Sequence, residues 1–252
     1  MTINWDDTAA AIWRPGRGYL REVQRIDPIR FSQLLGIEKQ KQLLIGNTEK
    51  FLRNQPANNV LLWGSRGTGK SSLIKALLNE YYEQQLRVVE IDKDDLVHLV
   101  DIVDEIRDVK KKFIVYCDDL SFEQGEKTYK ALKSVLEGSI ELPPENILIY
   151  ATSNRRHLLP EYMSENLSSQ LVDNEIHHGE AIEEKISLSD RFGLWISFYP
   201  FNQQEYLQII DHYFADFSGD RKKLHQQAIQ FATQRGGRSG RIAWQFFRNT
   251  GS

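Results

Sequence analysis

The chain has 252 residues, of which 40% are hydrophobic and 27% charged, which suits one large domain or one domain with a small appendage. Its formal net charge of −3 lacks the basic excess typical of nucleic-acid-binding modules, and the single cysteine, Cys117, excludes an intramolecular disulfide and a cysteine-based zinc site. With no secretory signal pattern and no apolar run near the roughly 18 residues of a membrane span, we expect a soluble, cytoplasmic protein with no membrane partner.

The first 57 residues form a lead-in to the main domain. Trp13, Leu20 and Ile29 can pack on a core from there. From Gly36 the apolar residues follow helical spacing as far as residue 51, and Pro56 then breaks the pattern before a turn.

Apolar runs with strand character then alternate with helical patterns. The runs lie at 60–63, 87–91, 113–117, 147–152 and 194–198, and helical segments at 71–82, 96–109 and 129–137 separate most of them. This alternation favours a parallel sheet covered on both faces, over a core at 58–200. After Pro200 only helical stretches follow, at 203–217, 221–234 and 240–248, and they predict a helical lid over 201–252.

Residues 64–71 fit the phosphate-loop pattern G-x-x-x-x-G-K-[ST]. The pattern follows a strand and opens a helix, as its mechanism requires. Its glycines let backbone N–H groups turn toward phosphate oxygens, Lys70 is expected against the β- and γ-phosphates, and the Ser71 hydroxyl is expected to hold Mg²⁺. The pattern predicts binding of ATP or GTP.

Polar side chains end the next two buried strands. Asp118 and Asp119 follow the run at 113–117, and Asn154 follows the run at 147–152. Ligands of open parallel sheets lie beyond the carboxyl ends of the strands. We therefore expect Asp118 to face Mg²⁺, Asp119 to activate the attacking water, and Asn154, or alternatively Thr152, to position that water against the γ-phosphate.

Two arginine segments extend this arrangement. Arg191 precedes the last strand and can project onto a γ-phosphate held by a neighbouring subunit. Arg238 and Arg241 lie at the start of the final helix, where an arginine can contact the nucleotide and couple it to the lid. Of these two we prefer Arg241.

In this order the five elements resemble those of the AAA+ ATPases, from about residue 31 onward. Residues 64–72 resemble Walker A and 113–119 Walker B; Asn154 matches sensor 1, Arg191 the arginine finger and Arg241 sensor 2. The segment at 35–38 resembles the one that closes over adenine. The resemblance implies an α/β P-loop NTPase with a five-stranded parallel sheet flanked by helices and a small C-terminal helical lid. It also implies ATP and Mg²⁺ as cofactors, a homo-oligomer, and a protein or nucleic-acid partner that the sequence does not identify.

One departure from the family pattern concerns rate. Most AAA+ proteins carry Asp-Glu where this chain has Asp118-Asp119, which, like 188–193, is similar to the bacterial replication initiator. The shorter carboxylate favours slow, switch-like hydrolysis.

Phrases such as NNVLLWGSRGTGKSSL, CDDLSFE and EEKISLSDRFGLW resemble a bacterial AAA+ family of unknown function. The acidic stretch 161–185 is expected to be a loop or short helices near the face between subunits, where Arg155-Arg156 can contact a subunit or a phosphate backbone.

The sequence therefore predicts an ATPase that acts at a subunit interface and drives a conformational change. The alternatives are a nucleotide-switched loader or adaptor with slow hydrolysis, which can be DNA-associated, and a small-molecule kinase, against which the arginine series and the lid speak. The candidate catalytic residues are Lys70, Asp119, Asn154 and Arg191; the metal ligands are Ser71 and Asp118. The candidate nucleotide-binding residues are Leu35, Gly36, Ile37, Gly64, Ser65, Arg66, Gly67, Thr68, Gly69, Lys70, Ser71, Ser72 and Arg241.

Overall fold

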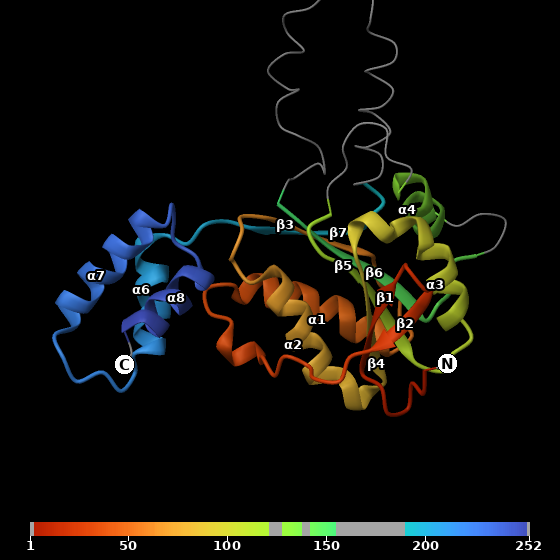
Figure 1. Cartoon of the computed structure of the whole chain (residues 1–252), viewed down its shortest axis with the longest axis horizontal. Helices are drawn as coiled ribbons and strands as arrows, with labels where there is room; N and C mark the ends of the chain where they lie inside the picture. Colours follow the sequence, from red (N-terminus) through yellow and green to blue (C-terminus); the bar gives the residue numbers. More distant parts are fainter. Residues whose placement is uncertain (1–2, 121–127, 138–141, 155–189, 251–252) are drawn as a thin grey trace, which may run out of the picture.

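The computed structural model describes residues 3–120, 128–137, 142–154 and 190–250 (Figure 1). The expected loop or short helices at 161–185 and the Arg155-Arg156 pair fall outside these ranges. None of the described helices combines the length and the hydropathy that a bilayer span requires.

A seven-stranded sheet runs through the molecule in the order β2-β1-β4-β5-β6-β3-β7. The five strands from β4 to β7 in this order are parallel to one another, and they coincide with the five predicted apolar runs. These strands are β3 (Val60–Gly64), β4 (Leu86–Ile91), β5 (Lys112–Cys117), β6 (Ile147–Ser153) and β7 (Leu194–Phe198). Since β3 lies between β6 and β7, the phosphate-loop strand is flanked by two others whose carboxyl ends meet at the same edge.

The sheet has two strands more than the five expected, because the lead-in folds into a hairpin. β1 (Ala10–Arg14) pairs antiparallel with β2 (Tyr19–Glu22) and parallel with β4. Gly18 closes the turn with a left-handed φ of 59°, and its N–H donates to the carbonyl of Arg14 at 3.0 Å. Trp13 and Leu20 are buried, so their predicted packing on the core is confirmed.

Helices cover both faces of the sheet (Figure 1). Strand residues alternate between two buried clusters, as the two-residue period of a strand requires: Val88 and Ile114 pack with α1 and α2, whereas Val89 and Val115 pack with α3 and α4. The helical elements of the core are η1 (Phe31–Gln33), α1 (Glu38–Leu52), α2 (Lys70–Tyr81), η2 (Tyr82–Gln84), η3 (Lys93–His98), α3 (Leu99–Ile106) and α4 (Thr128–Glu137).

Three helices after residue 200 form the lid: α6 (Gln203–Tyr213), α7 (Arg221–Gln234) and α8 (Gly240–Thr250). The Asn202 side chain accepts from the Glu205 N–H and the Glu205 carboxylate from the Asn202 N–H, a capping box that fixes the start of α6. α6 ends at Tyr213, four residues earlier than predicted. The apolar pattern that predicted the longer helix includes Phe214 and Phe217. These residues lie beyond the helix and contact each other edge to face, at 5.9 Å between ring centroids.

Candidate functional site

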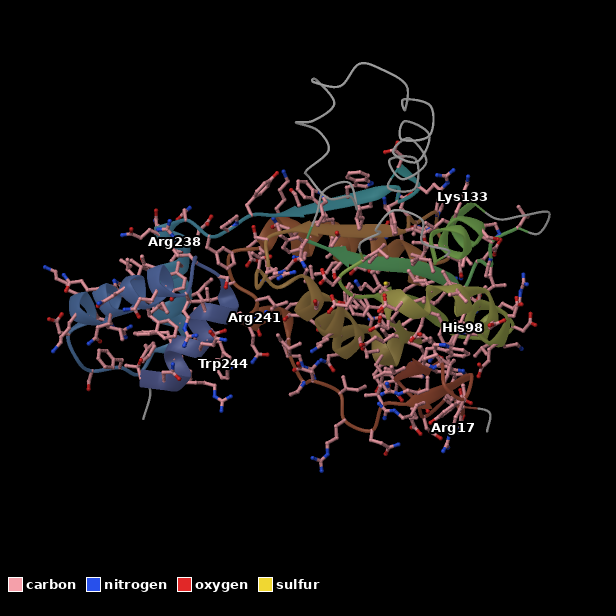
Figure 2. The ribbon with its side chains drawn as sticks, turned by 45° about the horizontal axis from the view of Figure 1, so that its top comes forward. Arg17, His98, Lys133, Arg238, Arg241 and Trp244 are labelled. Atoms are coloured by element: carbon pink, nitrogen blue, oxygen red, sulfur yellow. The ribbon has the colours of Figure 1, made fainter. Side chains whose placement is uncertain are left out.

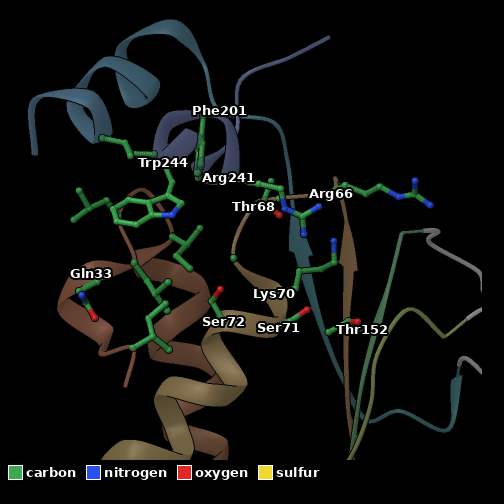
Figure 3. Close-up of a pocket in the computed structure, with 18 of the residues that line it drawn as sticks. Gln33, Arg66, Thr68, Lys70, Ser71, Ser72, Thr152, Phe201, Arg241 and Trp244 are labelled. Atoms are coloured by element: carbon green, nitrogen blue, oxygen red, sulfur yellow. The ribbon is translucent and has the colours of Figure 1, made fainter. Parts of the chain in front are cut away.

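A cleft of about 960 Å³ opens between the carboxyl edge of the sheet and the lid. Residues from the lead-in, the phosphate loop, β5, β6 and the lid all line it (Figure 3). Most of the predicted site residues are among them, namely Leu35, Ile37, Arg66, Gly67, Thr68, Gly69, Lys70, Ser71, Ser72, Asp118, Asp119, Asn154 and Arg241. Strands and helices distant in sequence thus place the predicted chemistry around one volume.

Lys70 begins α2, and its charged end lies between the phosphate loop and β6. Its Nζ donates to the carbonyls of Gly64 and Ser65, both at 2.8 Å, and to Asn154 Oδ1 at 3.3 Å. Burial lowers the pKa of Lys70 to about 8, against the opposing effect of Asp118 and Asp119. Burial has removed water from the ammonium group, and a phosphate anion bound in the cleft would compensate for that lost hydration.

Asp118 Oδ1 accepts hydrogen bonds from three hydroxyl groups. Ser71 Oγ donates at 2.9 Å and Tyr116 OH at 2.7 Å, and Thr152 Oγ1 donates as the third. Burial raises the pKa of Asp118, but the three hydroxyl donors together outweigh it and hold this pKa below the ordinary value. A carboxylate beside the hydroxyl of Ser71 supplies the hard oxygen ligands that Mg²⁺ prefers, so these residues fit the ion.

The described residues contain no group of three His, Cys, Asp or Glu side chains placed to hold a metal. A Mg²⁺ ion at Ser71 and Asp118 would therefore complete its shell with phosphate oxygens and water, the arrangement usual for this ion.

Asp119 and Asn154 are joined across β5 and β6. Asn154 Nδ2 donates to Asp119 Oδ1, and the Asp119 N–H donates to Thr152 Oγ1 at 2.9 Å. Asp119 has a left-handed φ of 52°, a backbone conformation that non-glycine residues adopt uncommonly and that is frequent at functional sites. Thr152, considered as an alternative to Asn154, instead bonds to both members of the acid pair.

The lid contacts the phosphate loop through the start of α8. The Arg241 N–H donates to the Gly67 carbonyl at 3.3 Å. Gly67 has a φ of 74°, and a Cβ there would lie 2.8 Å from Ser239 Oγ, so glycine permits this close approach. Arg241 lines the cleft, whereas Arg238 is absent from the lining and bonds through its carbonyl to the Phe201 N–H. The geometry therefore favours Arg241 as the lid arginine.

Four predicted residues lie away from the cleft lining. Gly36, with a φ of 74°, packs beside Phe201. Gly64 ends β3, and Ser65 donates its N–H to the Phe198 carbonyl. Arg191 is half-buried and precedes β7, at the edge of the parallel sheet opposite the carboxyl ends of the strands. The structure thus separates Arg191 from the phosphate loop of its own chain.

Two further residues of the site were absent from the sequence-based prediction. Tyr116 lies two residues before Asp118, so the strand period places them on the same side, and this spacing was the available signal. Trp244 lines the cleft from α8, is 45% exposed, and contacts Tyr213 at 5.3 Å between ring centroids (Figure 3). Its position depends on how the lid is oriented, which a single helix does not reveal.

Known proteins resemble this chain at three levels. A family model described as a protein of unknown function, DUF815, matches residues 6–252. Two variants of RuvB from Thermotoga maritima share the fold, each with a TM-score of 0.51 over 87% of this chain and 71% of theirs, at 13% and 15% identity. The large subunit of replication factor C from Ignicoccus hospitalis is 35% identical over 77 residues, which are 30% of this chain and 16% of that protein. The chain therefore shares the α/β fold of these RuvB structures.

Proposed function

The chain belongs to the DUF815 family, and we propose that it is an ATPase that binds ATP with Mg²⁺ and hydrolyses it at the interface between identical subunits, to change the conformation of a partner or assembly. One observation carries this proposal. Lys70, Asp118, Asp119, Asn154 and Arg241 come from four separate elements and line a single cleft of about 960 Å³, which is large enough for a nucleotide.

The residues divide the work of phosphoryl transfer to water. Backbone N–H groups of the phosphate loop and Lys70 bind the phosphates, and Ser71 and Asp118 would hold Mg²⁺. The ion would supply charge neutralisation on the β- and γ-phosphate oxygens. Asn154 orients the attacking water, and Asp119 accepts its proton as the oxygen attacks the γ-phosphorus and the bond to the β-phosphate oxygen breaks.

A neighbouring subunit completes the site in this proposal. Arg191 precedes β7 at the amino edge of the sheet, away from the phosphate loop of its own chain. Its guanidinium therefore needs a second copy of the chain to reach a γ-phosphate, where it would stabilise the charge of the transition state. A homo-oligomer follows from this requirement.

A second candidate is a nucleotide-switched loader or adaptor that hydrolyses slowly. Two observations favour it. Asp119 is one methylene shorter than the glutamate usual at this position in AAA+ proteins, and its carboxylate is held by the Asn154 amide. Release of Asp119 would then require Asn154 to bind the γ-phosphate first, which couples activity to nucleotide state.

Phosphate release by the purified protein tests the function directly. With ATP and Mg²⁺, we expect specific activity to rise with protein concentration, because the complete site needs two subunits. Tight ATP binding with negligible phosphate release at every protein concentration would favour the nucleotide-switched loader or adaptor over the ATPase. Absence of ATP binding would contradict both.

The aromatic side of the cleft gives a separate prediction about the nucleobase. Trp244 is partly exposed beside Ile37 and Leu34, which offer an apolar surface to a base. Stacking of a base on an aromatic ring contributes about 1–3 kcal/mol, so Trp244→Ala should weaken ATP binding roughly tenfold. Trp244→Phe should keep most of the affinity. Isothermal titration of ATP measures both, and equal affinity in wild type and Trp244→Ala would place the base elsewhere.

A further inference from the structure

The β1–β2 hairpin has two chemically different faces. Trp13 and Leu20 are buried in the cluster formed with α3. The register pairs Arg14 with Tyr19 and Ile12 with Arg21, and side chains alternate along a strand. Arg14, Tyr19 and Arg21 therefore share the face turned away from that cluster, and Tyr19 is 37% exposed there.

Arginines are concentrated in this part of the chain, although the chain as a whole has a net charge of −3. The side chains of Arg14, Arg17 and Arg25 are exposed and form no ion pair or hydrogen bond with any residue that the structure describes. Between residues 10 and 30 the only acidic residues are Glu22 and Asp27, and Asp27 is paired with Lys75. Glu90 of β4 is paired in register with Ile12 and offsets part of the charge of Arg14 on this face. The arginines of the hairpin outnumber it, so like charges remain close together, and an anion bound there would relieve their repulsion.

The fold places these arginines at the functional edge of the sheet. β1 runs parallel to β4, so Arg14 and the turn at 15–18 lie at the carboxyl ends of the strands, as the nucleotide cleft does. Figure 2 labels Arg17 in that turn, at the end of the molecule far from the lid. A ligand bound here would lie along the same edge as the cleft without occupying it.

We propose that the outer face of the β1–β2 hairpin binds the sugar-phosphate backbone of a nucleic-acid strand. Arg14 and Arg21 are diagonal neighbours across the hairpin, about 7–8 Å apart at such positions, so each guanidinium can bind a separate phosphate through its paired donors. Tyr19, directly opposite Arg14 and two residues before Arg21 on β2, offers a ring on which a base can stack. Arg17 extends the positive surface at the turn.

The composition of this face favours a polyanion over a protein partner. The centre of a protein interface is depleted of charged residues and enriched in large apolar ones. Here Arg14 and Arg21 occupy the centre, and they are accompanied by Tyr19, the partly buried Ile12 and, from the neighbouring strand β4, Glu90. The inference concerns a surface separate from the nucleotide cleft, and its test needs no ATP, so its failure would leave the proposed ATPase untouched.

Fluorescence anisotropy with a labelled single-stranded oligothymidylate tests the proposal on the full-length chain, from 50 to 200 mM salt. Arg14→Glu/Arg17→Glu should weaken binding at least tenfold at 50 mM salt. It should also reduce the slope of log K against log salt by about 1.4, because each phosphate contact on a single strand contributes about 0.7. Tyr19→Ala should weaken binding several-fold and leave the slope unchanged, since stacking releases no counterions.

Matched variants separate a specific surface from general electrostatics. Lys222→Glu/Lys223→Glu makes the same change of charge at exposed positions of α7 and should stay within twofold of wild type. Arg14→Lys/Arg17→Lys keeps the charge and should retain the salt slope, which guards against misfolding of the Glu variant. The proposal is overturned if wild type does not bind the oligonucleotide at 50 mM salt, if the α7 variant loses as much affinity, or if polyglutamate competes as well as unlabelled oligonucleotide.

Discussion

Lys70→Ala is expected to abolish nucleotide binding at micromolar concentrations and to leave the fold intact. The Lys70 ammonium is buried, and no other described cation lies on the loop carbonyls of Gly64 and Ser65. Its bonds to phosphate oxygens would be charge-assisted and poorly screened by water, and such contacts are the strong class of hydrogen bonds. We expect affinity to fall about 100-fold or more, which corresponds to ~3 kcal/mol. Titration of a fluorescent ATP analogue measures this loss.

Stability should change little in the same variant. Burial already lowers the pKa of Lys70 to about 8, so the charged side chain is held at a cost of lost hydration. Removing it relieves that cost, and the Ser65 carbonyl keeps the hydrogen bond that Thr68 Oγ1 donates to it at 2.8 Å. Lys75→Ala, on the next turn of α2, removes an exposed ion pair with Asp27 and serves as the control that should bind nucleotide normally. Wild-type affinity in Lys70→Ala would exclude the phosphate loop as the nucleotide site.

The phosphate loop and acid pair were accessible from the sequence because each depends on short-range spacing. The loop pattern fixes Lys70 and Ser71 one residue apart, and a buried run ending in Asp118 fixes the acid at a strand end. Parallel topology then brings strand ends together, and the structure places Ser71 Oγ 2.9 Å from Asp118 Oδ1.

The β1–β2 hairpin and the position of Trp244 in the cleft could not be predicted from the sequence, because long-range contacts determine both. β1 and β2 have only five and four residues, and the pairing of Ala10 with Val88 joins segments that no local pattern relates. Trp244 faces the cleft only because the α8 start packs on Gly67. The end of α6 was misplaced for a related reason, since the buried Phe214 packs edge to face against Phe217 after the helix has ended. Tertiary packing decided each of these features.

Arg191→Ala is expected to bind ATP with wild-type affinity and to lose about 10³-fold in turnover. Arginines supplied by a neighbouring chain stabilise the transition state and contribute on the order of 10³–10⁵ to the rate in related phosphoryl transfers. Because Arg191 lies at the edge opposite the cleft, its loss should not disturb nucleotide contacts within the same chain. Phosphate release and ATP titration on the same preparation separate the two effects. Arg53→Ala, which removes an exposed ion pair on α1, is the matched control.

Mixing two inactive variants distinguishes a neighbour's arginine from a residue acting within one chain. Lys70→Ala lacks a working nucleotide site but still carries Arg191, whereas Arg191→Ala keeps the site and lacks the arginine. At an interface between the two, the nucleotide held by Arg191→Ala meets the arginine of Lys70→Ala, so activity should reappear in the mixture. Its amount should follow the fraction of mixed interfaces and peak near equal proportions. If the two chains co-assemble and the mixture is as inactive as its components, the trans role is contradicted. Arg191 would then act within its own subunit or only in folding.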